Sequence, residues 1–146
     1  MGATVDLGEL FAPYGVAVDD GVARTLQAYL TLLTKWSRRI NLTGHKDEGV
    51  AAEKLLIDGA PLAQLINAHG RGPCTVADVG AGGGGLAVVV HCLCPEAEVH
   101  AIEPRTKRAV FLRTVRRDLG LARLHVHEGR VEEGSLPGGL DAVDAI

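Results

Sequence analysis

The chain has 146 residues, of which 47% are hydrophobic and 23% are charged, and its formal net charge is -3. These values are typical of an ordinary globular protein with one core, and they exclude two full-sized domains. The three cysteines, Cys74, Cys92 and Cys94, are odd in number and lack zinc-site spacing, so we expect no disulfide framework and a cytoplasmic protein. Residues 1–10 lack the pattern of a signal peptide and no apolar run could span a bilayer, so we expect neither secretion nor membrane insertion.

The first half of the chain predicts helices. Apolar residues recur in steps of three or four over residues 19–40, which places them on one helix face, and two aspartates suit the helix start. A second helical stretch is predicted over residues 47–60, and Pro61 restarts a helix that continues to Asn67. Glycines and a proline at 70–73 interrupt the pattern. We therefore expect a helical extension, residues 1–72, joined to a core, residues 73–146, in one compact unit.

The second half of the chain alternates between strand and helix patterns. Strands are predicted at 76–79, 99–103 and 124–128, and a fourth begins at 141–146. The segments between them, 86–93 and 104–120, carry the apolar spacing of helices. This alternation predicts an α/β fold with a parallel sheet and right-handed crossovers.

A glycine turn follows the first predicted strand. Gly80, Gly82 and Gly85 fit the spacing of dinucleotide-binding loops, while Gly84 in place of Gly85 gives a tighter alternation, so the glycines alone do not name a cofactor. Asp78 favours S-adenosylmethionine, because a carboxylate at the strand end would engage its ammonium group and repel a pyrophosphate. The alternative is that the glycines only build a turn and Asp78 caps backbone groups.

Two later segments are expected at the same edge of the sheet. Glu103 ends the second strand about twenty residues after the glycines, where Rossmann-type folds place an acid on the ribose hydroxyls. Residues 129–133 follow the third strand and would lie beside the adenine. The alternatives are a solvated glutamate and a charged surface loop.

The predicted helix at 104–120 holds the densest positive charge of the chain. Such a field suits RNA phosphates, although a solvated helix face with cations near its end is an equally simple interpretation. The six histidines show no metal spacing, so we expect no metal, and no serine, histidine and acid arrangement indicates a hydrolase. The predicted RNA-binding residues are Lys107, Arg108, Arg113, Arg116 and Arg117.

Taken in order, several motifs resemble one known family, the 16S ribosomal RNA guanine-N7 methyltransferases, also called glucose-inhibited division protein B. The likeness extends from about Leu26 to the end of the chain. It rests on Trp36 with residues 40–43, on residues 54–58 and 78–82, on Lys107-Arg108 with Phe111-Leu112, and on residues 130–133.

The resemblance implies a Rossmann-like S-adenosylmethionine-dependent methyltransferase fold and methylation of a guanine N7 in the small-subunit rRNA. Guanine N7 has a free lone pair and no proton, so the reaction needs positioning rather than a base, and we name no catalytic residue. The implied partner is 16S rRNA or the small subunit, and the expected state is a monomer. By position, Gly80 and Gly85 would line the cofactor loop together with Asp78 and Gly82, Glu103 would lie near the ribose, and Val131 and Glu132 would flank the adenine.

The sequence departs from the family at several points. Gly85-Leu86-Ala87 replaces a bulky residue followed by proline and glycine, Leu55 replaces a histidine, and Ile146 stands where the family has an arginine. Family members also continue through several more strands, so we expect a core truncated after the fourth strand. This leaves two alternatives, a non-catalytic homologue that retains cofactor or RNA binding, and a nicotinamide-dependent oxidoreductase suggested by the glycine spacing.

Overall fold

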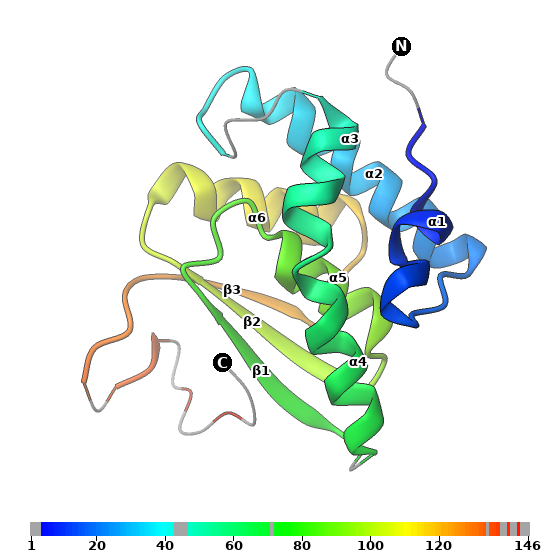
Figure 1. Ribbon diagram of the computed structural model, residues 1–146. Helices are drawn as coiled ribbons and strands as arrows, with labels where there is room; N and C mark the ends of the chain where they lie inside the picture. The colour runs from blue at the N-terminus through cyan, green and yellow to red at the C-terminus, as the bar shows by residue number, and fades with distance from the viewer. Residues whose placement is uncertain are drawn as a thin grey trace.

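The computed structural model describes residues 4–42, 47–70, 72–133, 135–137, 140 and 143. Within this part of the chain, three parallel strands form a sheet in the order β1-β2-β3 (Figure 1). The predicted α/β class with a Rossmann-like arrangement is confirmed. The predicted fourth strand, residues 141–146, lies outside the described residues apart from Val143. The strands are β1 Cys74–Val79, β2 Ala97–Glu103 and β3 Leu124–Glu128.

The two crossover helices are α5 Gly85–Leu93 and α6 Thr106–Asp118. Because crossovers between parallel strands are right-handed as a rule and both run in the same direction along the sheet, both helices are expected on one face, and Figure 1 shows them there. The carboxyl ends of all three strands therefore meet at one edge. Asp78 pairs in register with Ala101 and Glu103 with Glu128, so the acids that end these strands lie at that edge.

The first half of the chain is helical, as expected, but the helix boundaries differ: α2 Asp20–Ser37 is shorter than predicted, the stretch predicted at 47–60 is divided, and the last helix is longer, from Gly59 to His69. The long amphipathic helix ends at Ser37 rather than near residue 40, and Asp19 caps its start by accepting from the N–H of Val22 at 2.8 Å. Pro61 lies in the first turn of the last of these helices, where a missing N–H costs nothing. The elements are α1 Leu7–Phe11, the 3-10 turn η1 Ala12–Tyr14, α2 Asp20–Ser37, α3 Glu48–Ala51, the π-helical turn η2 Ala52–Leu56, and α4 Gly59–His69.

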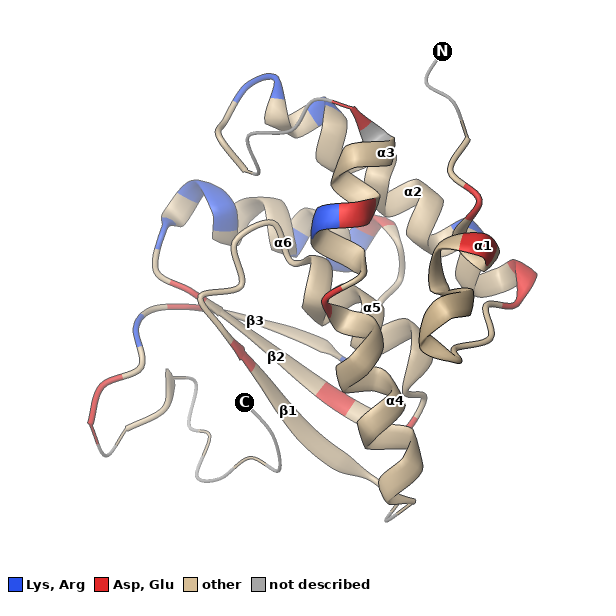
Figure 2. Ribbon diagram, in the orientation of Figure 1, with Lys and Arg blue, Asp and Glu red and all other residues tan. Residues whose placement is uncertain are grey.

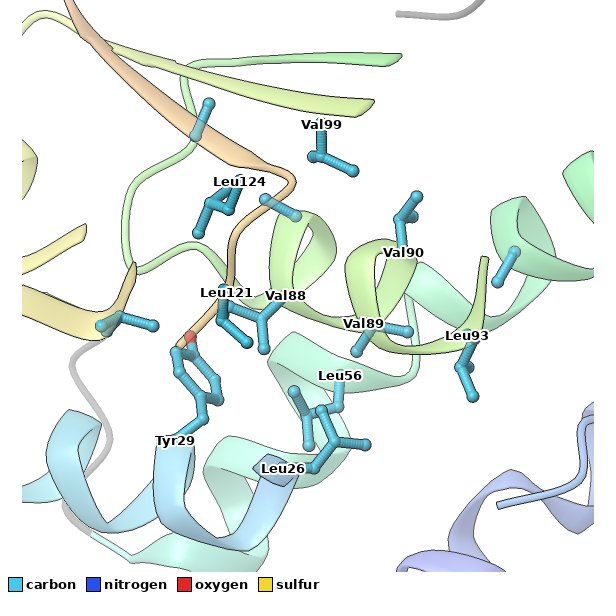
Figure 3. Close-up of a cluster of buried hydrophobic side chains, with 14 of the residues drawn as sticks. Leu26, Tyr29, Leu56, Val88, Val89, Val90, Leu93, Val99, Leu121 and Leu124 are labelled. Carbon is cyan, nitrogen blue, oxygen red and sulfur yellow. The ribbon is translucent and has the colours of Figure 1, made fainter. Parts of the chain in front are cut away.

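Helix α5 lies at the centre of the core. Its sequence is apolar almost all round because one side faces the sheet and the other faces α2, η2 and α4. Gly59 of α4 allows the closest approach, since a Cβ there would lie 2.7 Å from the Cβ of Val89. Figure 3 shows the buried cluster between α5, the sheet and α2. None of the helices in the described part of the chain is both long and apolar enough to cross a membrane.

Candidate cofactor and RNA site

The glycine turn after β1 is held by its own backbone and by β2. The N–H groups of Gly80 and Ala81 both donate to the carbonyl of Ile102, at 2.8 and 3.1 Å. Gly80, Gly82 and Gly84 have φ values of 73°, 58° and 81°, a region that favours glycine. A Cβ at Gly80 would meet nothing within 4 Å, so this part of the turn faces open space in which a ligand can approach the backbone.

Gly85 has a different environment from Gly80. It is buried, and a Cβ there would lie 2.6 Å from the carbonyl oxygen of Leu55. The absence of a side chain at Gly85 thus lets α5 pack against η2. A role for Gly85 in cofactor binding stays a prediction.

Asp78 presents an unusual carboxylate at the end of β1. The N–H of Ala87 bonds to this carboxylate, but its Oδ2 atom is buried and has no hydrogen-bond partner. Burial, which outweighs the opposing effect of the Ala87 bond and is reinforced by the charge of Glu103, raises the pKa of Asp78 to about 6. A buried carboxylate oxygen without a partner, next to an open glycine turn, suits a cationic ligand group.

Glu103 fastens the turn to the end of β2. Only 3% of this residue is exposed, so it is not the solvated glutamate of the alternative interpretation. Its Oε2 accepts from the N–H of Gly82 and its Oε1 from the N–H of Arg105, both at 2.9 Å. Each oxygen can accept a second bond, so a contact with ribose hydroxyls is compatible with these two.

Tyr29 is a contributor that the sequence analysis missed. Its hydroxyl donates to the carbonyl of Gly83 at 2.6 Å, although the two residues belong to α2 and the glycine turn. Figure 3 shows Tyr29 extending from α2 into the buried cluster. Burial, and after it the charge of Asp78, raises the pKa of Tyr29, so the phenol stays a neutral donor. Helical spacing places Tyr29 between Leu26 and Leu33 on the apolar face, and its burial could have been predicted from this spacing.

The segment after β3 begins beside Glu103, because the N–H of Gly129 donates to the Glu103 carbonyl at 3.2 Å. Val131 is 39% exposed, and Glu132 forms an isolated antiparallel bridge with Ser135. The segment therefore starts at the predicted edge. That Val131 and Glu132 flank an adenine stays a prediction.

The five predicted RNA-binding residues of α6 are not equivalent. Four of them contact other protein groups: Arg108 donates to the carbonyl of Asn41 at 3.2 Å, Arg113 lies 3.5 Å from Glu128, Arg116 donates to the carbonyl of Leu124 at 2.6 Å, and Arg117 contacts Asp118 at 2.8 Å. Lys107 is exposed and has no polar partner among the described residues. The cations at the start of α6 are thus more available than those further along.

A cleft of about 250 Å³ lies between the end of α2 and the start of α6. Arg108 connects this cleft to the glycine turn, because its Nη1 lies 4.0 Å from where a Cβ on Gly82 would be. The lining residues are Ile40, Asn41, Arg105, Thr106, Lys107 and Arg108.

Histidines gather away from this site, on the face of the sheet opposite α5 and α6. His100 and His127 share a hydrogen bond of 2.8 Å, and His125 contacts Glu98 at 2.6 Å. Among the described residues, no group of three or more histidine, cysteine or acidic side chains is arranged to hold a metal ion.

A parallel sheet with a glycine turn after β1 and a buried acid at the end of β2 is typical of Rossmann-like nucleotide-binding domains. Comparison with known families is more specific. The family described as rRNA small subunit methyltransferase G matches residues 22–146, and the chain belongs to this family.

Three relatives, each named ribosomal RNA small subunit methyltransferase G, illustrate the similarity. One from Leptothrix cholodnii is 35% identical over 120 residues, which are 82% of this chain and 55% of the relative. One from Neisseria gonorrhoeae is 33% identical over 121 residues, 83% of this chain and 56% of the relative. One from Xylella fastidiosa is 37% identical over 107 residues, 73% of this chain and 48% of the relative. The chain thus spans about half the length of the curated relatives it matches.

Proposed function

We propose that this chain binds S-adenosylmethionine and methylates a guanine N7 of 16S rRNA. The observation that carries the proposal is the buried, unpartnered Oδ2 of Asp78 beside the open backbone of Gly80, in a chain of this family. A carboxylate in that place fits the ammonium group of the cofactor, whereas it would repel the pyrophosphate of a nicotinamide cofactor. Family membership also argues against the oxidoreductase alternative.

The proposed roles follow from the contacts of each residue. Asp78 would hold the ammonium group, Gly80 and Gly82 would line the cofactor, and Glu103 would accept from the ribose hydroxyls. Val131 and Glu132 would flank the adenine. When bound, S-adenosylmethionine supplies an electrophilic methyl group. Because guanine N7 carries a lone pair and no proton, the chain has to orient the base and exclude water rather than remove a proton.

The proposal also includes the setting in which the chain works. Its partner is small-subunit rRNA, its location is the cytoplasm and its state is a monomer. The helical extension, residues 1–72, and the core, residues 73–146, act as one unit, because Tyr29 of the extension holds Gly83 of the glycine turn.

A transfer experiment tests the activity. Incubation with labelled S-adenosylmethionine and unmodified small-subunit RNA should place the label on guanine N7, identified by nuclease digestion and mass spectrometry. Calorimetric titration with S-adenosylhomocysteine, run on the same sample, reports cofactor binding. Binding without any transfer would remove the catalytic claim and favour the alternative, a homologue that retains cofactor or RNA binding without turnover.

Replacement of Glu103 tests the cofactor site separately. Glu103→Ala should weaken S-adenosylhomocysteine binding by about 1–3 kcal/mol, because it removes charge-assisted hydrogen bonds to the ribose and the anchor of Gly82. Arg24→Ala, at an exposed position on α2, is the control. Unchanged affinity of the Glu103 variant would show that this acid does not face the ligand.

A further inference from the structure

We propose that the cleft between the end of α2 and the start of α6 binds a phosphodiester of the substrate RNA, and that Arg105 and Lys107 bind the phosphate. This inference rests on the proposed function and deepens it, because it assigns the RNA to one cleft instead of to the whole of α6. The cleft has a volume of about 250 Å³, and both cations line it.

The argument begins with which cations are available. Along α6 the guanidinium groups of Arg113, Arg116 and Arg117 are engaged by Glu128, the Leu124 carbonyl and Asp118. Arg105 and Lys107 are exposed, and their side chains have no hydrogen-bond or ion-pair partner among the described residues. A cation without a protein partner keeps its full charge for a phosphate.

The surroundings of the cleft are also positive. Arg108 forms part of its wall, and the exposed residues Arg38 and Arg39 directly precede Ile40, which lines the other side. Figure 2 shows positive segments both where α2 ends and where α6 starts. Two acids contact residues of the lining: Glu128 accepts from the Thr106 hydroxyl at 2.5 Å, and the buried Glu103 accepts from the N–H of Arg105 at 2.9 Å. Among the residues that the structure describes around the cleft, cations therefore outnumber acids.

The position of the cleft connects it to methyl transfer. The N–H of Arg105 donates to Glu103, whose other oxygen holds Gly82, and Arg108 approaches the same glycine. The glycine turn and the cleft are thus adjacent, and Arg105 and Arg108 lie between them. A nucleotide whose phosphate sits in the cleft would have its base within reach of the turn, whereas a phosphate at Arg117 would lie near the far end of α6, since Arg117 is ten residues and about 15 Å along the helix from Lys107.

The test compares charge-neutral variants of the whole chain. A short single-stranded RNA with a fluorescent end is titrated at several salt concentrations. The double variant Arg105→Gln, Lys107→Gln should bind it about tenfold more weakly at low salt, and the slope of log affinity against log salt should flatten by about 0.7 for each phosphate charge that the variant no longer neutralises. Its affinity for S-adenosylhomocysteine should stay unchanged, and Lys107→Arg should keep the RNA affinity of the parent.

Two variants serve as comparisons. Arg24→Gln removes one exposed charge about 20 Å from the end of α2 and should leave the RNA affinity within twofold. Arg117→Gln should have a smaller effect than Lys107→Gln. Equal RNA affinity of the double variant and the parent, a loss matched by Arg24→Gln, or a larger loss for Arg117→Gln would overturn the inference. So would an equal loss of S-adenosylhomocysteine affinity, because the two side chains would then support the turn.

Inorganic phosphate separates a free-anion site from a site for an RNA strand. It should displace the RNA no better than potassium chloride at the same ionic strength; stronger displacement would overturn the assignment to a strand. The proposed function can fail separately. If the parent chain transfers no methyl group but its RNA affinity still depends on Arg105 and Lys107, the proposed activity is wrong and the RNA-binding cleft stands.

Discussion

Asp78 has two properties that lower the stability of the free protein and suit the binding of a cationic ligand. Its Oδ2 atom is buried without a partner, and burial raises the pKa of the carboxyl to about 6. In the unfolded chain an aspartate ionises near its ordinary pKa of about 3.9, so ionised Asp78 lowers the free energy of unfolding at neutral pH. The carboxylate is therefore a cost to the free protein that a bound cation would offset.

Replacement of Asp78 should show this cost. Asp78→Asn should raise the free energy of unfolding by about 1–2 kcal/mol at pH 8, since the amide removes the buried charge but leaves an unpartnered N–H group. The gain should shrink as the pH falls from 6 to 4, where the carboxyl of the parent is protonated as well. Urea denaturation of both proteins across this range measures it. A variant less stable than the parent at pH 8 would contradict the role assigned to the charge.

Tyr29 joins two parts of the chain through one hydrogen bond. Tyr29→Phe keeps the ring and removes only the hydroxyl, which leaves the buried Gly83 carbonyl without that donor. The free energy of unfolding should fall by about 1–3 kcal/mol, with an unchanged denaturant slope. Tyr14→Phe, at a partly exposed position, is a matched control and should change stability by less than about 0.5 kcal/mol. Equal stability of Tyr29→Phe and the parent would contradict the importance of the bond.

At the scale of elements, packing between helices depends on single glycines. Gly59→Ala places a Cβ 2.7 Å from the Cβ of Val89, so α4 must move away from α5. Such overpacking should lower the free energy of unfolding, measured by thermal denaturation, by about 1–3 kcal/mol. The double variant with Val89→Ala, in which the two valine methyl groups are removed, should recover part of this loss relative to the sum of the single changes. Simple additivity would show that the two positions do not interact.

Local patterns predicted the elements better than their contacts. The spacing of apolar residues and the positions of glycines correctly predicted the three strands, α5 and α6, because these signals depend on residues only a few positions apart. The short α1 was not predicted, since its five residues bury only Leu7 and Phe11. Glu103 was predicted at the right edge, but its bonds to Gly82 and Arg105 depend on how the turn folds back over β2. The arginines of α6 looked alike in sequence because their partners, Asn41, Leu124 and Glu128, come from other elements.

At the scale of the whole molecule, the helices cover one face of the sheet, and histidines occupy the opposite face. His100 bonds to His127 at 2.8 Å and stacks on His125 with the ring centroids 4.6 Å apart. Burial, and after it the neighbouring histidines, lowers the pKa values of His100 and His127. On the covered side, burial and then the charge of Arg123 lower the pKa of His91 to about 4.

His91, His100 and His127 make the protein sensitive to acid. Each of them has a lower pKa in the folded chain than in the unfolded chain. Above about pH 6.5 the histidine is neutral in both states and does not reduce stability; as the pH falls toward the folded pKa, the unfolded chain binds the proton first and the free energy of unfolding decreases. Asp78 has the opposite effect between pH 6 and 4, because its protonation in the folded chain raises the free energy of unfolding. Asp78 contributes one proton to this balance, whereas the histidines contribute three. The free energy of unfolding should therefore be lower at pH 5.5 than at pH 7.5, as measured by urea denaturation. Asp78→Asn should steepen the loss below pH 6, because the opposing proton is then removed. Greater stability of the parent at pH 5.5 than at 7.5 would show that the histidines are protonated in the folded chain without cost.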